Sequence, residues 1–141
     1  MEWNEFNKGV FLVNVLGIIY NKSKNEILIG ERADDPYIKN LSWTFPGGRP
    51  AYKDDLEVYL KNEIKKKTGL DVNVKKVIFA KTYPERREFL SIYYLCEPVG
   101  GEEKAGEKFV RIKWINPTEV KNYFTTSIHP VLFDFLKNIK S

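Results

Sequence analysis

The sequence predicts an α+β fold in which helices cover the faces of a mixed sheet. Stretches of alternating or β-branched apolar residues, which are typical of strands, recur along the chain between turn residues. Two other stretches repeat apolar residues every three or four positions, which is typical of amphipathic helices. The elements follow in the order strands, helix, strands, helix, and this order indicates an α+β sandwich. A chain of 141 residues suits one core, so we expect a single domain over residues 1–141.

The expected strands form two hairpins and one further strand. They lie at residues 10–20, 26–31, 71–83, 89–96 and 109–115. The polar residues 21–25 should join the first two strands, and the turn at residues 84–87 should join the third and fourth. The glycine pair at residues 47–48 is expected to make a tight turn. Residues 33–41 and 97–108 are polar and should be loops, which often carry specificity.

The central helix has clear start and stop signals. Asp54 suits the N-cap position, and Glu57 follows at the spacing of a capping box. Gly69 suits the left-handed conformation that ends a helix. The stripe that should face the core consists of Leu56, Leu60 and Ile64. A second helix should begin at Pro130. Its apolar face consists of Leu132, Phe135, Leu136 and Ile139.

Composition and charge exclude several classes of protein. No apolar run is long enough to span a membrane, and the N-terminus lacks the pattern of a secretory signal, so we expect a cytoplasmic protein. Cys96 is the only cysteine, which excludes an internal disulfide, and its apolar surroundings indicate a buried thiol.

The basic residues gather at one end of the central helix. The net charge is +4, and glutamate in place of Lys66 and Lys67 would bring it to zero. An anionic partner could bind at this helix end. No aromatic residues interleave with these lysines, so we do not expect nucleic acid as a partner.

The stretch from Trp43 to Leu70 resembles the Nudix box, whose family pattern is G-x5-E-x7-R-E-U-x-E-E-x-G-U with U aliphatic. The fixed positions of the pattern fall, in order, on Gly48, Asp54, Asn62, Glu63, Ile64, Lys66, Lys67, Gly69 and Leu70. The spacing fits throughout, and the preceding Trp-x-Phe-Pro-Gly-Gly is also common in that family. The residue types depart from the pattern at Asp54, Asn62, Lys66 and Lys67. The resemblance covers about residues 9–139.

The resemblance to Nudix domains implies an α-β-α sandwich in which the box forms a loop–helix–loop beside the sheet. It implies hydrolysis of a nucleoside diphosphate linked to another group, so the expected partner is a nucleotide or a nucleotide-linked small molecule. It also implies Mg²⁺ or Mn²⁺ as the cofactor of an active enzyme. Nudix domains are often dimers, which makes a homodimer possible.

The carboxylates that such a metal needs are mostly missing from the box. Magnesium prefers hard oxygen ligands, and a helix can present carboxylates at i, i+3 and i+4 on one face. The family pattern would place glutamates at positions 63, 66 and 67, but only Glu63 remains. Lys66 and Lys67 put ammonium groups where the metal should bind, and these groups repel a cation.

Two interpretations of the box helix need no metal. In the first, its charged side chains form a solvated face, where Glu63 and Lys67 have the favourable i,i+4 order. In the second, Lys66 and Lys67 replace the metal and bind a diphosphate directly as point charges. Arg87 and Tyr83 are then further candidates for substrate binding.

A third interpretation retains an enzyme with a rearranged metal site. Glu63 is then the catalytic residue and a metal ligand, and the backbone at Gly48 contributes as it does in the family. Glu103 and Glu107, from the glycine-rich loop that follows the hairpin, supply the remaining carboxylates. The sequence therefore leaves two classes of function open: a Nudix hydrolase with a degenerate box, or a non-catalytic module that binds a nucleotide or another protein and needs no cofactor.

Overall fold

The structure is a computed structural model that describes residues 8–32, 43–125 and 128–140. The expected loop at residues 33–41 lies outside the described residues. The strands are β1 (Leu12–Asn21), β2 (Glu26–Arg32), β3 (Trp43–Thr44), β4 (Gly47–Gly48), β5 (Leu70–Thr82), β6 (Phe89–Gly101) and β7 (Phe109–Ile115). The helices are α1 (Leu56–Thr68), the 3-10 helix η2 (Pro117–Asn122) and α2 (Pro130–Asn138).

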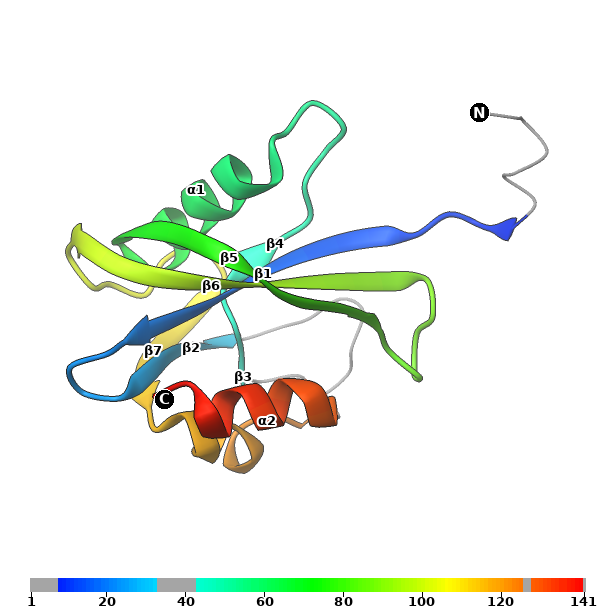
Figure 1. Ribbon diagram of the computed structural model, residues 1–141. Helices are drawn as coiled ribbons and strands as arrows, with labels where there is room; N and C mark the ends of the chain where they lie inside the picture. Colours follow the sequence, from blue (N-terminus) through cyan, green and yellow to red (C-terminus); the bar gives the residue numbers. More distant parts are fainter. Residues whose placement is uncertain (1–7, 33–42, 126–127, 141) are drawn as a thin grey trace.

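Strand β1 lies at the centre of the mixed sheet (Figure 1). It pairs in parallel with β6 from Leu12 to Ile19, and in antiparallel fashion with β4 and, at its far end, with β2. The β5–β6 hairpin extends the sheet on one side, and β2 pairs with β3 and β7 on the other. The predicted hairpins and the strand at residues 109–115 are thereby confirmed.

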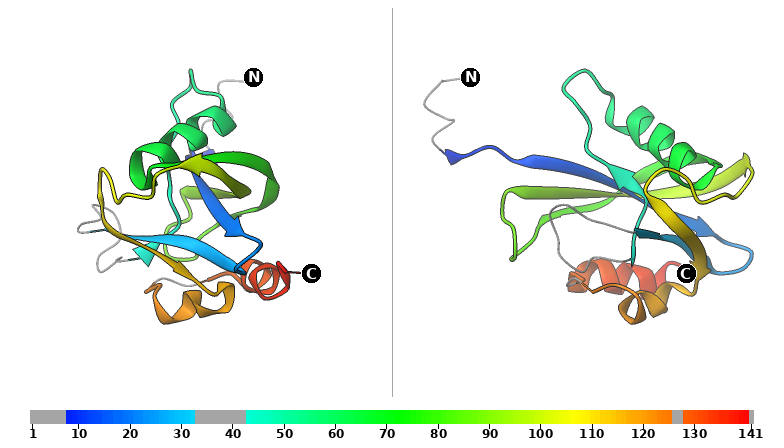
Figure 2. Two further views of the ribbon diagram at one scale, coloured as in Figure 1. Left: turned by 90° about the vertical axis from the view of Figure 1, so that its left-hand side faces the viewer. Right: turned by 180° about the vertical axis from the view of Figure 1, so that it is seen from behind.

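The two helical layers cover opposite faces of this sheet, with α1 on one face and α2 and η2 on the other (Figures 1 and 2). The alternation of β1 serves both layers, since successive side chains point to opposite faces. Val15 and Ile19 pack with Leu60 and Ile64 of α1. On the opposite face Ile18 packs with the second core, which contains Ile27, Ile29, Leu132 and Leu136. The predicted α+β sandwich is therefore confirmed.

A glycine in β1 lets α1 lie close to the sheet. A Cβ at Gly17 would lie 2.7 Å from Cδ1 of Ile64, nearer than side-chain atoms approach one another. The helix ends as predicted, because Gly69 adopts the left-handed conformation with φ of 78°. Cys96 is buried as expected, and burial raises the pKa of its thiol to about 12.

The start of α1 differs from the sequence prediction by one residue. The N-cap is Asp55, whose Oδ1 accepts from the backbone N–H groups of Glu57 and Val58, each at 3.1 Å. Asp54 instead accepts from the backbone N–H of Ala51 at 2.7 Å and closes the preceding turn. The prediction of Asp54 as the cap was wrong, because two adjacent aspartates compete and only the preceding turn decides between them.

Two other boundaries also differ from the prediction. The glycine pair at residues 47–48 forms strand β4 rather than a turn, since it pairs with Leu16 and Val15 of β1. The loop expected at residues 97–108 begins only after Gly101. Its first residues continue β6, because their pairing with β5 extends as far as Leu70.

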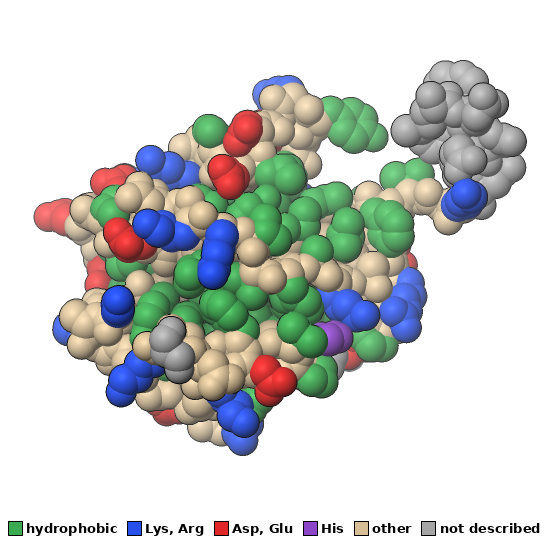
Figure 3. All heavy atoms as spheres, viewed as in Figure 1, with side chains coloured by type: hydrophobic (Ala, Val, Ile, Leu, Met, Phe, Trp, Pro, Cys, Tyr) green, Lys and Arg blue, Asp and Glu red, His purple; other side chains and the backbone are tan. Residues whose placement is uncertain are grey.

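The surface mixes charges of both signs with apolar side chains. Figure 3 shows apolar side chains gathered across the middle of one face, between the positions of α1 and α2 in Figure 1. Among the helices that the structure describes, none is both long and apolar enough to cross a membrane.

Candidate functional site

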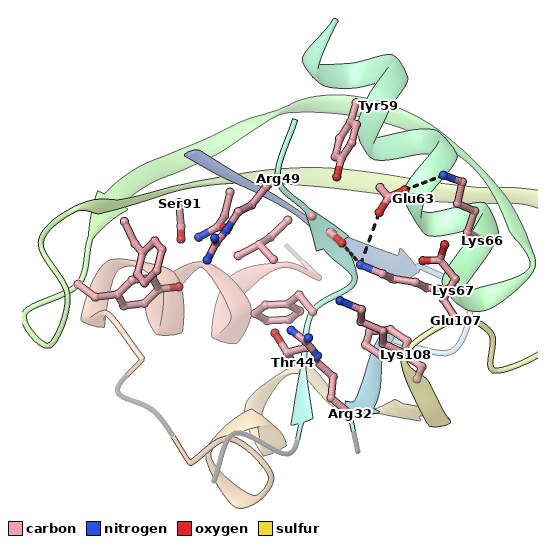
Figure 4. Close-up of a pocket in the computed structure, with 18 of the residues that line it drawn as sticks. Arg32, Thr44, Arg49, Tyr59, Glu63, Lys66, Lys67, Ser91, Glu107 and Lys108 are labelled. Atoms are coloured by element: carbon pink, nitrogen blue, oxygen red, sulfur yellow. Dashed lines mark hydrogen bonds and ion pairs between the residues drawn. The ribbon is translucent and has the colours of Figure 1, made fainter. Parts of the chain in front are cut away.

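A cavity of about 630 Å³ lies between α1, the strands β1 to β4 and the β5–β6 turn. This volume falls in the range of small-molecule sites. Figure 4 shows charged side chains of α1 and of the segment before β7 at one end, and Arg49 and Ser91 toward the other. We call the first the charged end (Gly47, Glu63, Lys66, Lys67, Glu107 and Lys108) and the second the aromatic end (Tyr83, Arg86, Phe89 and Ser91).

Helix α1 delivers its charged side chains to the cavity from one face. Tyr59, Glu63, Lys66 and Lys67 recur at three- and four-residue intervals, so they share one face of the helix, beside the apolar stripe. Glu63 is paired twice: its Oε2 lies 3.2 Å from Nζ of Lys66, and its Oε1 lies 3.7 Å from Nζ of Lys67. Nζ of Lys67 also donates a hydrogen bond to the backbone carbonyl of Gly47.

The two lysines differ strongly in exposure. The side chain of Lys66 is 58% exposed, whereas that of Lys67 is 15% exposed. Burial lowers the pKa of Lys67, and the negative charges of Glu63 and Glu107 oppose this shift only in part. Lys67 is therefore not part of a solvated helix face, although Lys66 is.

Tyr59 lies one helical turn before Glu63 and is half-buried beside the charged end. Burial, followed by the charge of Glu63, raises the pKa of Tyr59 to about 12, while a hydrogen bond from the backbone N–H of Arg49 opposes the shift. The phenol therefore stays protonated. Gly48 permits this arrangement, because a Cβ there would lie 2.5 Å from Oη of Tyr59.

Further cations reach the cavity from other elements. Arg32 comes from the end of β2, Lys108 from the segment before β7, and Arg86 from the β5–β6 turn. Arg49 follows β4 and donates from Nε to Oδ1 of Asn14 at 3.1 Å. Its guanidinium lies 4.7 Å from the centre of the Phe89 ring, a cation–π distance.

The aromatic end contains a buried side-chain hydroxyl, that of Ser91. Oγ of Ser91 is buried and has no hydrogen-bond partner among the described residues. Beside it on the cavity wall, Tyr83 shares a hydrogen bond with Tyr93, at 2.5 Å between the two hydroxyl oxygens. The guanidinium of Arg86 lies 5.1 Å from the centre of the Phe89 ring. A ligand that reaches Ser91 could satisfy its hydroxyl.

The cavity brings together most of the residues that the sequence suggested. Gly48, Glu63, Lys66, Lys67, Tyr83 and Glu107 all line it. Glu103 and Arg87 are not among its lining residues. The carboxylate of Glu103 accepts from Nε1 of Trp114 at 2.8 Å, and Arg87 donates to Oγ1 of Thr82 at 3.3 Å.

Sequence reasoning missed several lining residues. Tyr59 could have been found, because it lies four residues before Glu63 on the same helix face. Arg49 stands next to the box glycine, which is a weaker signal. Arg32 and Lys108 carry no motif, and only the pairing of β2 with β7 brings them to this cavity.

The residues present do not fit a divalent metal ion at this helix. Both carboxylate oxygens of Glu63 face ammonium groups, and the Gly47 carbonyl accepts from one of them. No group of three His, Cys, Asp or Glu side chains within residues 8–32, 43–125 and 128–140 is arranged to hold a metal. The hard oxygens that α1 and β4 could offer to Mg²⁺ at this position are therefore already paired with ammonium groups.

Two curated relatives resemble the sequence over most of its length. A "MutT-like protein" of Streptomyces ambofaciens is 26% identical over 110 residues, which are 77% of this chain and 66% of that protein. An "ADP-ribose pyrophosphatase" of Methanocaldococcus jannaschii is 29% identical over 131 residues, which are 91% of this chain and 70% of that protein. The chain thus spans about two thirds of the length of these relatives.

Solved structures share the fold at lower identity. A NUDIX hydrolase from Nitrosomonas europaea superposes with a TM-score of 0.75 at 18% identity, covering 92% of this chain and 72% of that one. A MutT protein from Methanosarcina mazei Go1 gives a TM-score of 0.72 at 17% identity, covering 94% and 96%. The family model described as NUDIX domain matches residues 10–136. With the box spacing, the sandwich and this match in agreement, the chain belongs to the Nudix family.

Proposed function

We propose that the cavity binds a nucleotide-linked small molecule through its diphosphate. The observation that carries the proposal is the charge of the lining: six Lys or Arg residues face three glutamates. Four of these cations, Lys66, Lys67, Arg32 and Lys108, converge from α1, β2 and the segment before β7, whereas Arg49 and Arg86 line the cavity toward the aromatic end. Such convergence suits the several oxygens of a diphosphate, because lysine acts as a point charge and arginine as a fork of donors.

The aromatic end suits the uncharged part of the same ligand. Guanidinium groups and aromatic rings can stack on a base, and the buried hydroxyl of Ser91 can bond a polar group of the ligand. A ligand that is anionic at one end and planar or hydroxylated at the other matches both ends. The substrate class expected from the family, a nucleoside diphosphate linked to another group, has this polarity.

Hydrolysis of the bound diphosphate is the second candidate function. It is favoured by the position of Glu63, a carboxylate held at the charged end by two lysines. The name of one relative, an ADP-ribose pyrophosphatase, points to the same reaction. Because the lining does not fit a metal on α1, we derive no metal-assisted step, and Glu63 as the catalytic residue is part of the proposal.

Calorimetric titration in the presence and absence of a chelator separates these functions. The ligands are ADP-ribose, nucleotide sugars, nucleoside triphosphates and dinucleoside polyphosphates, first with EDTA and then with Mg²⁺ or Mn²⁺. We expect at least one of them to bind with EDTA present. If no ligand binds under either condition, the proposal fails.

Turnover is followed with the same panel by phosphate-product chromatography. A hydrolase would lose turnover in Glu63→Gln, and unchanged turnover would remove Glu63 from the mechanism. A protein that binds these ligands but does not hydrolyse them is the non-catalytic module.

We also propose a cytoplasmic location and a homodimer. Light scattering on a sizing column would test the homodimer.

A further inference from the structure

We infer that the ammonium of Lys67 is a built-in cation, held between the Gly47 carbonyl and the Glu63 carboxylate where a divalent metal ion would need those oxygens. The charged end is therefore complete without a metal. That it holds a diphosphate directly rests on the proposed function, but the exclusion of metal can be tested separately.

Oxygens from two different elements converge on Nζ of Lys67. The Gly47 carbonyl belongs to β4 and the Glu63 carboxylate to α1, yet both contact Nζ of Lys67. Carbonyl and carboxylate oxygens are the hard ligands that Mg²⁺ and Mn²⁺ select. Figure 4 shows the Lys67 side chain reaching from α1 to the backbone of β4, with Glu63 on one side and Lys108 on the other. The ammonium thus uses two oxygens that a metal would need.

The side chain of Lys67 is fixed in this position. Its side chain is 15% exposed, and α1 is held on the sheet by Leu60 and Ile64, which are fully buried. The side chain of Lys66, by contrast, is 58% exposed. Its ion pair with Glu63 is open to solvent on the lysine side and therefore contributes little to stability. If a ligand displaces the ammonium of Lys66 from Glu63, this ammonium can move into solvent. Lys67, rather than the pair of lysines, is therefore the residue that closes the site to metal.

The positive charge of Lys67 repels a metal ion and attracts a diphosphate. A divalent ion that approached these oxygens would face twice the repulsion that a monovalent ion would, beside an ammonium whose side chain is only 15% exposed. A diphosphate, by contrast, is attracted by the same ammonium. An ammonium has three donors, and the Gly47 carbonyl accepts from one of them while Glu63 forms an ion pair at 3.7 Å, so at least one donor can be directed to a phosphate oxygen.

The test is Mn²⁺ binding to the full chain, measured by electron paramagnetic resonance of the free ion. We expect no binding by the unmodified protein up to millimolar Mn²⁺. Lys67→Glu should gain at least tenfold in Mn²⁺ affinity, because it replaces the ammonium by a third oxygen ligand. The matched control is Lys61→Glu, which makes the same charge change on an exposed position of the same helix and should gain nothing.

Two outcomes would overturn the inference. One is that the unmodified protein binds Mn²⁺ as tightly as Lys67→Glu does. The other is that Lys67→Glu, folded by circular dichroism, still binds no Mn²⁺. If Lys67→Glu does not fold, Lys67→Met removes the charge and keeps the apolar stem, and it should also gain measurable Mn²⁺ affinity.

A second arm measures ADP-ribose affinity in EDTA. We expect the unmodified protein to bind, and Lys67→Met to bind at least tenfold more weakly. Binding that requires added metal would overturn the inference. If none of the ligands in the wider panel binds at all, the proposed function fails, while the Mn²⁺ measurement still decides the role of Lys67.

Discussion

The two ends of the cavity satisfy their polar groups in different ways. At the charged end Glu63 has two ammonium partners, and Lys67 is shared between Glu63 and Gly47. At the aromatic end the hydroxyl of Ser91 is buried without a partner among the described residues. One end is internally paired, whereas the other leaves a polar group for a ligand to satisfy.

This difference assigns different tasks to the two ends. An anion at the charged end competes with Glu63 for ammonium groups already in place, so its affinity depends on the number of cations that surround it. A polar group at the aromatic end relieves the cost of an unsatisfied hydroxyl and therefore fixes the orientation of the ligand. We expect charge to set how tightly the ligand binds, and the aromatic end to set which ligand binds.

Gly47→Ala should disturb the charged end most. A Cβ at this position would lie 2.0 Å from the carbonyl oxygen of Val15 and 2.9 Å from Cα of Leu16, so the backbone of β4 or β1 must move. We expect the free energy of unfolding to fall by about 1–3 kcal/mol, as for an overpacked core. Urea denaturation would measure this loss.

The loss should extend to ligand binding, because the displaced carbonyl would no longer hold Lys67. Gly100→Ala is the matched control, since its Cβ would have no atom closer than 3.7 Å. If both variants were equally stable, close packing of β4 against β1 would not be what positions Gly47.

The pH dependence of binding should separate the ends next. Burial lowers the pKa of Lys67 below its ordinary value, so its ammonium is lost at a lower pH than that of an exposed lysine. The affinity for an anionic ligand should therefore fall as the pH rises through this lowered pKa. In Lys67→Arg the guanidinium stays charged, and the affinity should be nearly independent of pH over the same window.

Stability should change in the opposite direction over that window. Between the lowered pKa of Lys67 and its ordinary value of 10.5, the unfolded chain binds the proton that the folded chain has lost. The free energy of unfolding contributed by this residue therefore rises with pH there.

Calorimetric titration of the ligand from pH 7 to 10 would measure the affinity. If the affinity fell equally in the unmodified protein and in Lys67→Arg, the pH dependence would belong to another group.

The contrast between the ends also explains how far the sequence could predict the molecule. Periodicity placed the five long strands and both α-helices, because an element that buries one face repeats its apolar residues at every second position in a strand and every third or fourth in a helix. It could not choose between Asp54 and Asp55 as the cap. It also missed β4, since a two-residue strand of glycines has no side-chain pattern.

The charged end was more predictable than the aromatic end. The box spacing located Glu63, Lys66 and Lys67, which lie within one helix. Spacing could not show that Lys66 is exposed while Lys67 is largely shielded from solvent, because that depends on how β4 meets α1. The aromatic end comes from β6 and the β5–β6 turn, so Ser91 joins the site only through tertiary pairing.

Ser91→Ala should affect ligand binding without destabilising the protein. The substitution removes a buried hydroxyl that has no partner in the described structure, so the free energy of unfolding should stay the same or rise by up to about 1 kcal/mol. Ligand affinity should fall about two- to tenfold, the usual worth of one hydrogen bond. Calorimetry and urea denaturation would measure the two effects.

Ser23→Ala, at an exposed turn where the hydroxyl bonds Asn21, is the control for Ser91→Ala and should change neither quantity appreciably. A loss of stability in Ser91→Ala would mean that its hydroxyl has a structural partner. Unchanged affinity would remove Ser91 from the ligand contacts and leave orientation to the rings and guanidinium groups.

The smallest effects are expected for the two loop glutamates. Glu103 lies outside the cavity lining with its carboxylate on Trp114, so Glu103→Gln should leave ligand affinity unchanged. Glu107 lines the charged end, and its negative charge raises the pKa of Lys67 against the effect of burial. The same charge repels a diphosphate, and Glu107→Gln removes it. We expect affinity in EDTA to rise about twofold, as for a screened charge near solvent.

The sign of the Glu107 effect is informative because a metal site predicts the opposite result. If Glu107 held a cation for the ligand, Glu107→Gln would weaken binding in Mg²⁺ and leave it unchanged in EDTA. If Glu107 only opposes the anion, the variant binds more tightly in both media, and more so at low ionic strength, where its charge is less screened. Calorimetry in the four combinations of metal and salt distinguishes these cases without depending on turnover.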